Sequence, residues 1–333
     1  MRRIGVLGAG AHSTRMHGPA LARCRDERPD DIELRAVCDL DPGRRETYAD
    51  EFGFEATYES VDGMLAAEPL DAVVAVTPVS ATREVAADLL TRDVAVLVEK
   101  PPGETPEEAR ELAAVAERHG ADHAVSFNRR FNPAVRRARS WIAENAPERP
   151  PTHAISRLLR VDRSQAAFVT DTGIHAADTV CSFLGAPRCV SARVRPRSGS
   201  AAGERCVARA TFAAGSGTMP VGPDEDATAQ FALVPDAGCR TETCELLGPG
   251  YDVRIDVGAA RLTVSAGGDE AVRWELRDDA PVWERNGTLA ETRAFLDAVG
   301  RGEGFGPSLS EGARSLALAA AVGAGGDREL AGG

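Results

Sequence analysis

Long apolar runs are missing from this sequence of 333 residues, and acidic residues outnumber basic ones. Since no uninterrupted apolar segment approaches the length that crosses a bilayer, we expect no membrane span. The formal net charge of -12 disfavours binding to nucleic acid or to an anionic membrane, because neither is attracted to an acidic surface. Small molecules are therefore the expected ligands.

Paired cysteine motifs are missing as well. The seven cysteines form an odd set without a CxxC pair, which favours reduced thiols over a disulfide framework. Cys239 and Cys244 have no second Cys or His pair beside them, so we expect no zinc site and no other metal. The first residues lead directly into a strand pattern without a signal-peptide core. These observations together predict a cytoplasmic protein.

Lysine is the scarcest charged residue, since every cationic side chain except that of Lys100 is arginine. An ammonium group can donate a proton, whereas a guanidinium group effectively cannot. We therefore expect a chemical role for Lys100; the alternative is a surface lysine that escaped a bias towards arginine. The residue follows Glu99 at the end of an apolar strand and precedes Pro101 and Pro102. A tight turn should aim its amine, so we predict a cis Lys100–Pro101 bond.

The N-terminal part of the chain alternates short apolar strands with helical patterns. The expected strands cover residues 4–7, 33–39, 71–76, 94–98 and 121–126. This alternation is typical of a right-handed, doubly wound parallel sheet. In such a fold the ligand binds beyond the carboxyl ends of the strands, so polar residues at those ends are candidates for a binding site.

A glycine turn follows the first strand. Gly8 permits a tight turn, and Gly10 lets a pyrophosphate approach the backbone at the start of a helix, where free N–H groups favour an anion. Ala11 and His12 continue this turn, and we expect all four residues to contact a dinucleotide. The glycine fingerprint is incomplete, because Ser13 stands at its third position.

Asp39 ends the second strand at the distance expected of a carboxylate that binds the adenosine ribose. A carboxylate there repels a 2'-phosphate, so we expect NAD as the cofactor and NADP to be less favoured, although Arg44 and Arg45 follow closely. Alternatively, Asp39 caps the next helix. The other expected cofactor contacts lie at the ends of later strands: Thr77, Pro78, Glu99 and Lys100.

The pattern changes in the second half of the chain. From residue 155 to 274, short alternating strands dominate apart from one helix, which predicts an open, mostly antiparallel sheet. Two helices are expected at 288–299 and 310–322, and a frayed tail from Gly325 onwards. We predict an α/β protein with three parts: a doubly wound Rossmann domain (1–126), an α+β domain (127–285) and C-terminal helices that pack back between the two (286–333).

The helix in the second half carries three polar residues at related positions. Asp171, His175 and Asp178 are spaced as i, i+4 and i+7, which places them on one face of an α-helix. A carboxylate one turn before a histidine can fix its tautomer and raise its basicity, as a general base requires. Alternatively, Asp171 is an N-cap and His175 is a core histidine.

These pieces together resemble the glucose-fructose oxidoreductase / inositol dehydrogenase / MocA family of nicotinamide-dependent oxidoreductases. The most specific shared patterns are Glu-Lys-Pro at residues 99–101 and Asp-x-Gly-x-His-x-x-Asp at residues 171–178. The glycine turn, Asp39, Thr77-Pro78 and the Arg-Arg-Phe sequence at 129–131 also match. The resemblance implies hydride transfer between NAD and a secondary alcohol or ketone of a polyol, cyclitol or sugar.

The resemblance also implies roles for individual residues. His175 would take the hydroxyl proton, Asp171 would orient it, and Lys100 would hydrogen-bond to the reacting oxygen. The residues expected to border the substrate are Asn128, Arg129 and Thr172. Family members often pair through the open face of the antiparallel sheet, which implies a homodimer or homotetramer.

One departure from the family pattern concerns the substrate. Many relatives have a glycine run shortly before the helix, whereas this chain has Ala-Phe-Val-Thr at residues 167–170, so we expect a reshaped pocket. Two other functions are compatible with the sequence. The chain could recycle its cofactor, as in an epimerase or a glycoside-processing relative, or it could be a non-catalytic NAD-binding sensor, although Lys100 and His175 are both retained.

Overall fold

The computed structural model describes the chain except for residues 162, 164–166, 196–204, 214–225 and 331–333. The chain forms two compact units. The first contains Met1–Asn128 and Pro281–Ala313, and the second contains Arg129–Ala280 and Arg314–Gly333. The predicted division at residues 126 and 285 stays a prediction.

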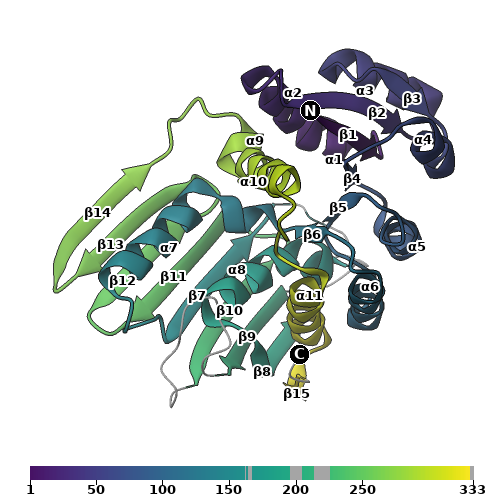
Figure 1. Ribbon diagram of the computed structural model, residues 1–333. Coiled ribbons are helices and arrows are strands. Elements are labelled where there is room, and N and C mark those ends of the chain that lie inside the picture. The colour runs from purple at the N-terminus through teal and green to yellow at the C-terminus, as the bar shows by residue number, and fades with distance from the viewer. Residues whose placement is uncertain (162, 164–166, 196–204, 214–225, 331–333) are drawn as a thin grey trace. The chain divides into compact units, whose positions relative to one another are not determined.

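The first unit is built on a sheet of six parallel strands in the order β3-β2-β1-β4-β5-β6 (Figure 1). Its strands are β1 (Arg2–Leu7), β2 (Ile32–Cys38), β3 (Ala56–Tyr58), β4 (Ala72–Ala75), β5 (Ala95–Glu99) and β6 (His123–Ser126). Its helices are α1 (Ala11–Arg15), α2 (His17–Glu27), α3 (Pro42–Phe52), α4 (Val61–Ala67), α5 (Val79–Leu89), α6 (Pro106–His119), α9 (Val282–Arg285) and α10 (Thr288–Arg301). This is the predicted doubly wound sheet.

The strand order changes direction between β1 and β4, and in folds of this kind the ligand-binding crevice lies at this point of the sheet. Both strands pair in parallel along their length, and all four residues of β4 are buried. A strand covered on both faces has apolar side chains throughout. Polar side chains are therefore disfavoured inside a strand such as β4, and ligands bind at the strand ends beside the reversal.

One core cluster joins the first part of the unit to a helix from near the end of the chain. Leu21 of α2, Tyr48 of α3 and Leu34 of β2 are nearly inaccessible and belong to this cluster. Phe295 and Leu296 of α10 belong to the same cluster. The helix predicted at residues 288–299 is thus part of the first unit, where its apolar face covers α2 and β1.

The second unit contains a mixed, mostly antiparallel sheet of nine strands in the order β14-β13-β12-β11-β7-β10-β9-β8-β15, as predicted. Among the described strands of this second sheet, only β7 and β10 pair in parallel. The strands are β7 (His153–Leu159), β8 (Pro187–Arg195), β9 (Arg205–Phe212), β10 (Ala227–Val234), β11 (Thr241–Gly248), β12 (Tyr251–Asp256), β13 (Arg261–Ala266), β14 (Asp269–Glu275) and β15 (Gly326–Glu329).

Helices cover one face of this sheet. The helical segments are η1 (Asn128–Phe131), α7 (Pro133–Asn145), η2 (Val169–Gly173), α8 (Ile174–Leu184) and α11 (Leu309–Ala324), of which η1 and α11 begin in the first unit. Helix α7 packs against β12 and β13, and α8 packs against β7, β10 and β11 (Figure 1). Every residue of α8 is buried, including the polar His175 and Asp178.

The predicted frayed tail is wrong for residues 326–329. These residues form β15, which pairs antiparallel with β8 from Gly326 opposite Ala192 to Glu329 opposite Cys189. Gly325 and Gly326 have φ angles of 69° and 77°, a region that favours glycine. The two glycines turn the chain from α11 into the strand, so the glycine pair marks a turn and not a loose end.

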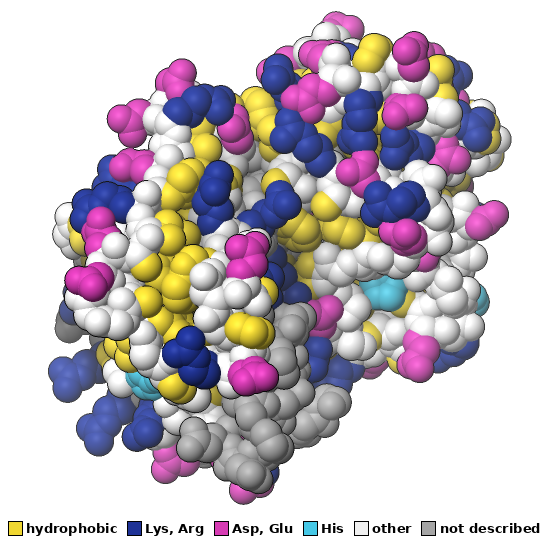
Figure 2. Space-filling model, turned by 60° about the vertical axis from the view of Figure 1, so that its left-hand side comes forward, with side chains coloured by type: hydrophobic (Ala, Val, Ile, Leu, Met, Phe, Trp, Pro, Cys, Tyr) yellow, Lys and Arg dark blue, Asp and Glu magenta, His cyan; other side chains and the backbone are white. Residues whose placement is uncertain are grey.

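Charged side chains of both signs are interspersed on the visible face in Figure 2. Elsewhere in the described residues, charged side chains form ion pairs such as Arg293 with Glu27 at 2.6 Å and Arg83 with Glu111 at 2.6 Å. Exposed pairs of this kind contribute little to stability.

Among the described helices, none combines the length and the apolar character needed to cross a membrane.

The packing of α10 predicts a large loss of stability when its core is truncated. Leu296→Ala should lower the free energy of unfolding by about 2–5 kcal/mol, because it removes a completely buried side chain. Leu40→Ala is the matched control, since Leu40 is 88% exposed and should change stability by less than about 0.5 kcal/mol. Urea unfolding followed by circular dichroism measures both; equal effects would contradict this packing.

Candidate functional site

The glycine turn adopts the conformation that the sequence predicts. Gly8 has a φ angle of 95°, and a Cβ atom there would lie 2.1 Å from the carbonyl oxygen of Val76. Any side chain at residue 8 would therefore displace the end of β4. At Gly10, by contrast, a Cβ atom would meet no described atom within 4 Å, so this side of the backbone is open to a ligand.

The third position of the fingerprint is used differently. Ser13 is completely buried, and its hydroxyl donates to the hydroxyl of Tyr48 in α3 at 3.0 Å. Burial raises the pKa of Tyr48, although the Ser13 hydrogen bond opposes the shift. Serine thus replaces the usual glycine contact with a polar link between α1 and α3.

Asp39 ties the glycine turn to the start of the next helix. Its Oδ2 accepts from the Ala9 backbone N–H at 2.8 Å, and its Oδ1 accepts from the Asp41 N–H at 2.9 Å. Asp41, and not Asp39, caps α3, because it accepts from the Arg44 N–H at 3.1 Å. The capping alternative for Asp39 is therefore wrong. Each carboxylate oxygen retains capacity for a ribose hydroxyl.

The two arginines behind Asp39 are already engaged. Arg45 donates to the carbonyl oxygen of Asp39 at 3.1 Å, and Arg44 lies 3.6 Å from a carboxylate oxygen of Asp41. A hollow of about 300 Å³ adjoins them. Its lining consists of Ala9, Thr14, Asp41, Gly43, Arg44, Thr47, Tyr48 and Glu51. The hollow therefore offers room for part of a dinucleotide between the glycine turn and α3.

The end of β4 carries the predicted Thr77 and Pro78. The Thr77 hydroxyl shares a hydrogen bond of 3.0 Å with the hydroxyl of Thr82, and Pro78 immediately precedes α5. Val76 donates its N–H to the carbonyl of Leu7 at 2.7 Å. These bonds hold the ends of β1 and β4 together beside the glycine turn.

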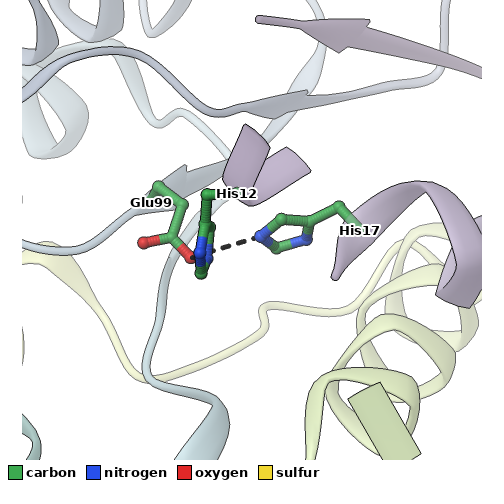
Figure 3. Close-up of side chains that lie close together, drawn as sticks. All are labelled: His12, His17 and Glu99. Carbon is green, nitrogen blue, oxygen red and sulfur yellow. Dashed lines mark hydrogen bonds and ion pairs between the residues drawn. The ribbon is translucent and has the colours of Figure 1, made fainter. Parts of the chain in front are cut away.

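Glu99, the last residue of β5, gathers two histidines from the segment after the glycine turn (Figure 3). Its Oε1 lies 3.0 Å from Nε2 of His12 and 3.2 Å from Nε2 of His17. Burial alone would raise the pKa of Glu99, but the two imidazoles and Lys100 outweigh it and hold the pKa well below its ordinary value. Glu99 is therefore ionised.

Two imidazoles and a carboxylate could in principle hold a metal ion, and these three offer ligand atoms close together. A histidine that binds a metal through Nε2 keeps its proton on Nδ1 and donates it to an acceptor. The Nδ1 of His17 is buried and has no hydrogen-bond partner among the described residues. The donor set therefore fits a neutral His17 that donates through Nε2 to Glu99, and not a metal centre.

Lys100 follows directly, and its peptide bond to Pro101 is cis. This confirms the backbone geometry predicted from the sequence. Lys100 is half-buried, whereas Pro101 and Pro102 are buried. The prolines therefore anchor the turn that carries the amine.

In the second unit, the polar motif begins in a π-helical turn, which the sequence did not predict. This turn, η2, includes Asp171 and Thr172 and continues directly into α8. The N-cap of α8 is Gly173 and makes no side-chain cap bond, so the alternative that Asp171 is a helix cap is wrong. Asp171 and Thr172 are half-buried, and His175 is 7% exposed. π-helical turns often occur at functional sites.

Glycine inside this motif has a steric cause. A Cβ atom on Gly173 would lie 2.9 Å from Cδ1 of Leu233 in β10, so a larger residue would require the buried Leu233 side chain to move. The bulky residues that replace the usual glycine run, Phe168 and Val169, are 0% and 6% exposed. They are buried within the second unit. The predicted effect of this loop on the substrate stays a prediction.

Asp178, the last residue of the motif, has a structural partner. Its carboxylate receives hydrogen bonds of 3.0 and 2.7 Å from Arg130 and one of 2.9 Å from the Ser315 hydroxyl. The Asp178 side chain is completely buried. It therefore joins η1, α8 and α11 within the second unit.

A buried ion triad lies in the same unit and was not predicted. Glu242 of β11 accepts from Arg129 at 2.8 Å and from Arg160 at 2.5 Å. Burial would raise the pKa of Glu242, but both guanidinium groups and, more weakly, His175 hold it below its ordinary range. Arg129 was predicted to border the substrate, and that role stays a prediction. Here its guanidinium binds Glu242.

The predicted site residues fall into two groups, one in each unit. The first unit brings together the glycine turn, Asp39, the end of β4, Glu99 and Lys100, and it also contains Asn128, which is buried and donates to the Thr288 hydroxyl at 3.1 Å. The second unit contains Arg129, Asp171, Thr172 and His175. His17, Arg160 and Glu242 were missed, because their partners are distant in sequence and the local pattern is that of an ordinary helix or strand.

Comparison with known proteins identifies the first unit's family. Residues 2–127 match the Gfo/Idh/MocA model, described as an oxidoreductase family with an NAD-binding Rossmann fold. The match covers the glycine turn, Asp39 and the Glu-Lys-Pro turn. It confirms the predicted family and the predicted cofactor, NAD.

Named relatives match over larger parts of the chain. Inositol 2-dehydrogenase of Rhizobium meliloti (strain 1021) is 27% identical over 96% of this chain and 95% of its own. D-glucoside 3-dehydrogenase of Escherichia coli (strain K12) is 32% identical over 56% of this chain and 54% of its own. A levoglucosan dehydrogenase in complex with NADH has the same fold, with a TM-score of 0.82, 17% identity and 99% coverage of both chains.

Asp39 predicts a preference between the two nicotinamide cofactors. NADH should bind at least about tenfold more tightly than NADPH, because the carboxylate repels a 2'-phosphate. Asp39→Asn should narrow this ratio, whereas Asp50→Asn, an exposed control in α3, should leave it unchanged. Titration of cofactor fluorescence measures the dissociation constants; tighter binding of NADPH to the unmodified protein would refute the assignment.

The ion triad predicts a pH-dependent contribution to stability. Glu242→Gln should lower the free energy of unfolding by about 3–5 kcal/mol at pH 7, because it removes the anion that pairs with the buried Arg160 and the half-buried Arg129. The folded-state pKa of Glu242 is depressed, so its contribution is present above the unfolded value of about 4.3 and is lost as the pH falls through the folded value.

The stability difference between the unmodified protein and Glu242→Gln should therefore shrink below about pH 4. Glu245→Gln is the control on the same strand, because Glu245 pairs with the largely exposed Arg254. This substitution should change the free energy of unfolding by less than about 1 kcal/mol. Urea unfolding between pH 3 and pH 7 measures the difference. A constant difference across that range would contradict the depressed pKa.

Proposed function

We propose that the chain, whose residues 2–127 match the Gfo/Idh/MocA oxidoreductase family, is an NAD-dependent dehydrogenase of sugars, cyclitols or related polyols. It would oxidise a secondary alcohol or reduce the corresponding ketone. The names of the relatives support this substrate class, since one is an inositol dehydrogenase and another a glucoside dehydrogenase.

The observation that carries the proposal is the polar π-helical turn at the start of an otherwise buried helix. Asp171 and Thr172 remain half-buried there while the residues of α8 that follow are buried. Burying a polar group is costly unless it is hydrogen-bonded, and polar groups that stay partly accessible beside a buried helix can hydrogen-bond to a ligand. The turn thus offers an acid, a hydroxyl and, one turn later, an imidazole to a ligand.

His175 is the proposed general base. It takes the proton of the substrate hydroxyl while NAD, when bound, supplies the acceptor for the hydride. Taking the proton makes the imidazole cationic, and the ionised Glu242 favours that form, because the two groups attract one another. Asp171 would position the imidazole and fix its tautomer.

Lys100 is the proposed donor to the reacting oxygen. Its ammonium group can hydrogen-bond to the oxygen in both the alcohol and the carbonyl form. A positive donor also stabilises the negative charge that develops on this oxygen as the proton leaves. Arginine could supply the charge but not the compact donor.

Substitution of the base tests the proposal. His175→Ala should lower kcat by about 100- to 10,000-fold while NADH still binds, since a general base contributes about that much. Asp171→Asn should lower kcat by a smaller factor, because the imidazole of His175 remains. Lys100→Arg should also be severely impaired. His119→Ala, in an exposed position of α6, is the control and should be fully active.

NADH formation with a panel of cyclitols, hexoses and glycosides measures these rates. In the unmodified protein the oxidation rate should rise with pH as the base loses its proton, and this rise should vanish in His175→Ala. Turnover of His175→Ala at the normal rate, with the same pH profile, would make His175 structural and leave Lys100 as the acid or base. Binding of NADH without turnover of any substrate would favour a sensor.

A further inference from the structure

The group formed by His12, His17 and Glu99 is not explained by dinucleotide binding alone. The Glu99 side chain is 11% exposed, that of His17 is 2% exposed, and that of His12 is 50% exposed. Both imidazoles direct Nε2 towards the same carboxylate oxygen (Figure 3). One carboxylate thus has a permanently buried partner and a partner that solvent can reach.

The two histidines differ in the charge they can carry. His17 already uses its Nε2 proton for Glu99, and a second proton would sit on Nδ1, which is buried without an acceptor among the described residues. A buried donor without an acceptor is unfavourable. His17 is therefore a neutral donor, and it leaves the negative charge of Glu99 in place. His12 is half-exposed, so water can solvate a proton on its ring.

The strand order places this group in a defined half of the fold. The sheet consists of two halves, β1 to β3 and β4 to β6, and each half of such a fold receives one mononucleotide. Asp39 ends β2 and is assigned to the adenosine ribose. Glu99 ends β5, so it belongs to the half that receives the nicotinamide mononucleotide.

The two redox forms of the cofactor differ in charge at this end. The oxidised nicotinamide ring carries one positive charge, and the reduced ring carries none, whereas the adenosine and pyrophosphate parts are the same. A buried anion in the nicotinamide half therefore distinguishes the two forms electrostatically. Interactions of this kind are strong where water is excluded.

We propose that Glu99, His12 and His17 form a charge-selective site that sets the relative affinity for oxidised and reduced nicotinamide cofactor. Glu99 favours the oxidised ring, and His17 holds the carboxylate in place without cancelling its charge. His12 is the residue through which that preference can be weakened, because a cation at this position opposes Glu99. The inference rests on NAD binding by the first unit and deepens the proposed function.

Equilibrium binding tests the inference without any substrate. The dissociation constant of NADH is measured by its own fluorescence and that of NAD+ by competition with NADH, on the full chain at pH 8 and low salt. Glu99→Gln should lower the ratio of the NADH constant to the NAD+ constant by about fivefold, because loss of the carboxylate charge weakens binding of the cationic ring and not of the neutral one.

Two further variants make the result specific. His12→Arg places a permanent cation beside Glu99 and should also lower the ratio of the NADH constant to the NAD+ constant. The arginine could attract the pyrophosphate, but that attraction would strengthen the binding of both cofactors equally and leave the ratio unchanged. Glu104→Gln removes an exposed carboxylate from the same turn and should leave the ratio unchanged. Because only the ratio is compared, a partial loss of folded protein affects both cofactors equally, and His12→Arg replaces Glu99→Gln should the latter fail to fold.

An unchanged ratio in both Glu99→Gln and His12→Arg, with cofactor still bound, would overturn the charge-selective site and leave the proposed dehydrogenase intact. Failure of the unmodified protein to bind either cofactor would overturn the proposed function as well. The two failures are therefore distinguishable in one experiment.

Discussion

Burial of the parallel strands on both faces is the constraint on which the first unit depends. Because the interior of a strand buried on both faces is apolar, as in β4, polar ligand-binding groups collect at the residues that follow the strands. Asp39, Glu99 and Lys100 occupy such positions, and Asp39 bonds to the glycine turn. The same burial that stabilises the sheet thus concentrates the polar groups along one edge.

The second unit differs from the first, because its charged groups are buried between the helices and the sheet. Charges in such a place persist only when they are paired. Arg130 and Ser315 satisfy Asp178, while Arg129 and Arg160 satisfy Glu242. The two arginines thereby stabilise the anionic form of Glu242, which also interacts electrostatically with His175.

Much of this could be predicted from the sequence where the signal is local. Strand ends with one acid each identified Asp39 and Glu99, and two adjacent prolines indicated the turn at Lys100. The π-helical turn was missed because its residues also fit an α-helix, and the partners of Glu242 were missed because strand pairing brings together residues distant in the chain. Gly325 and Gly326, at the start of β15, were mistaken for a loose end, although their positive φ angles form a turn.

The pairing of β15 with β8 has a practical consequence for handling the protein. An edge strand presents unpaired backbone groups that can recruit another chain. Residues 326–329 cover that side of β8, and they are themselves short, exposed and rich in charge. Trimming them to obtain a more compact protein would uncover a longer strand, β8, and would exchange a protected sheet border for one prone to aggregation.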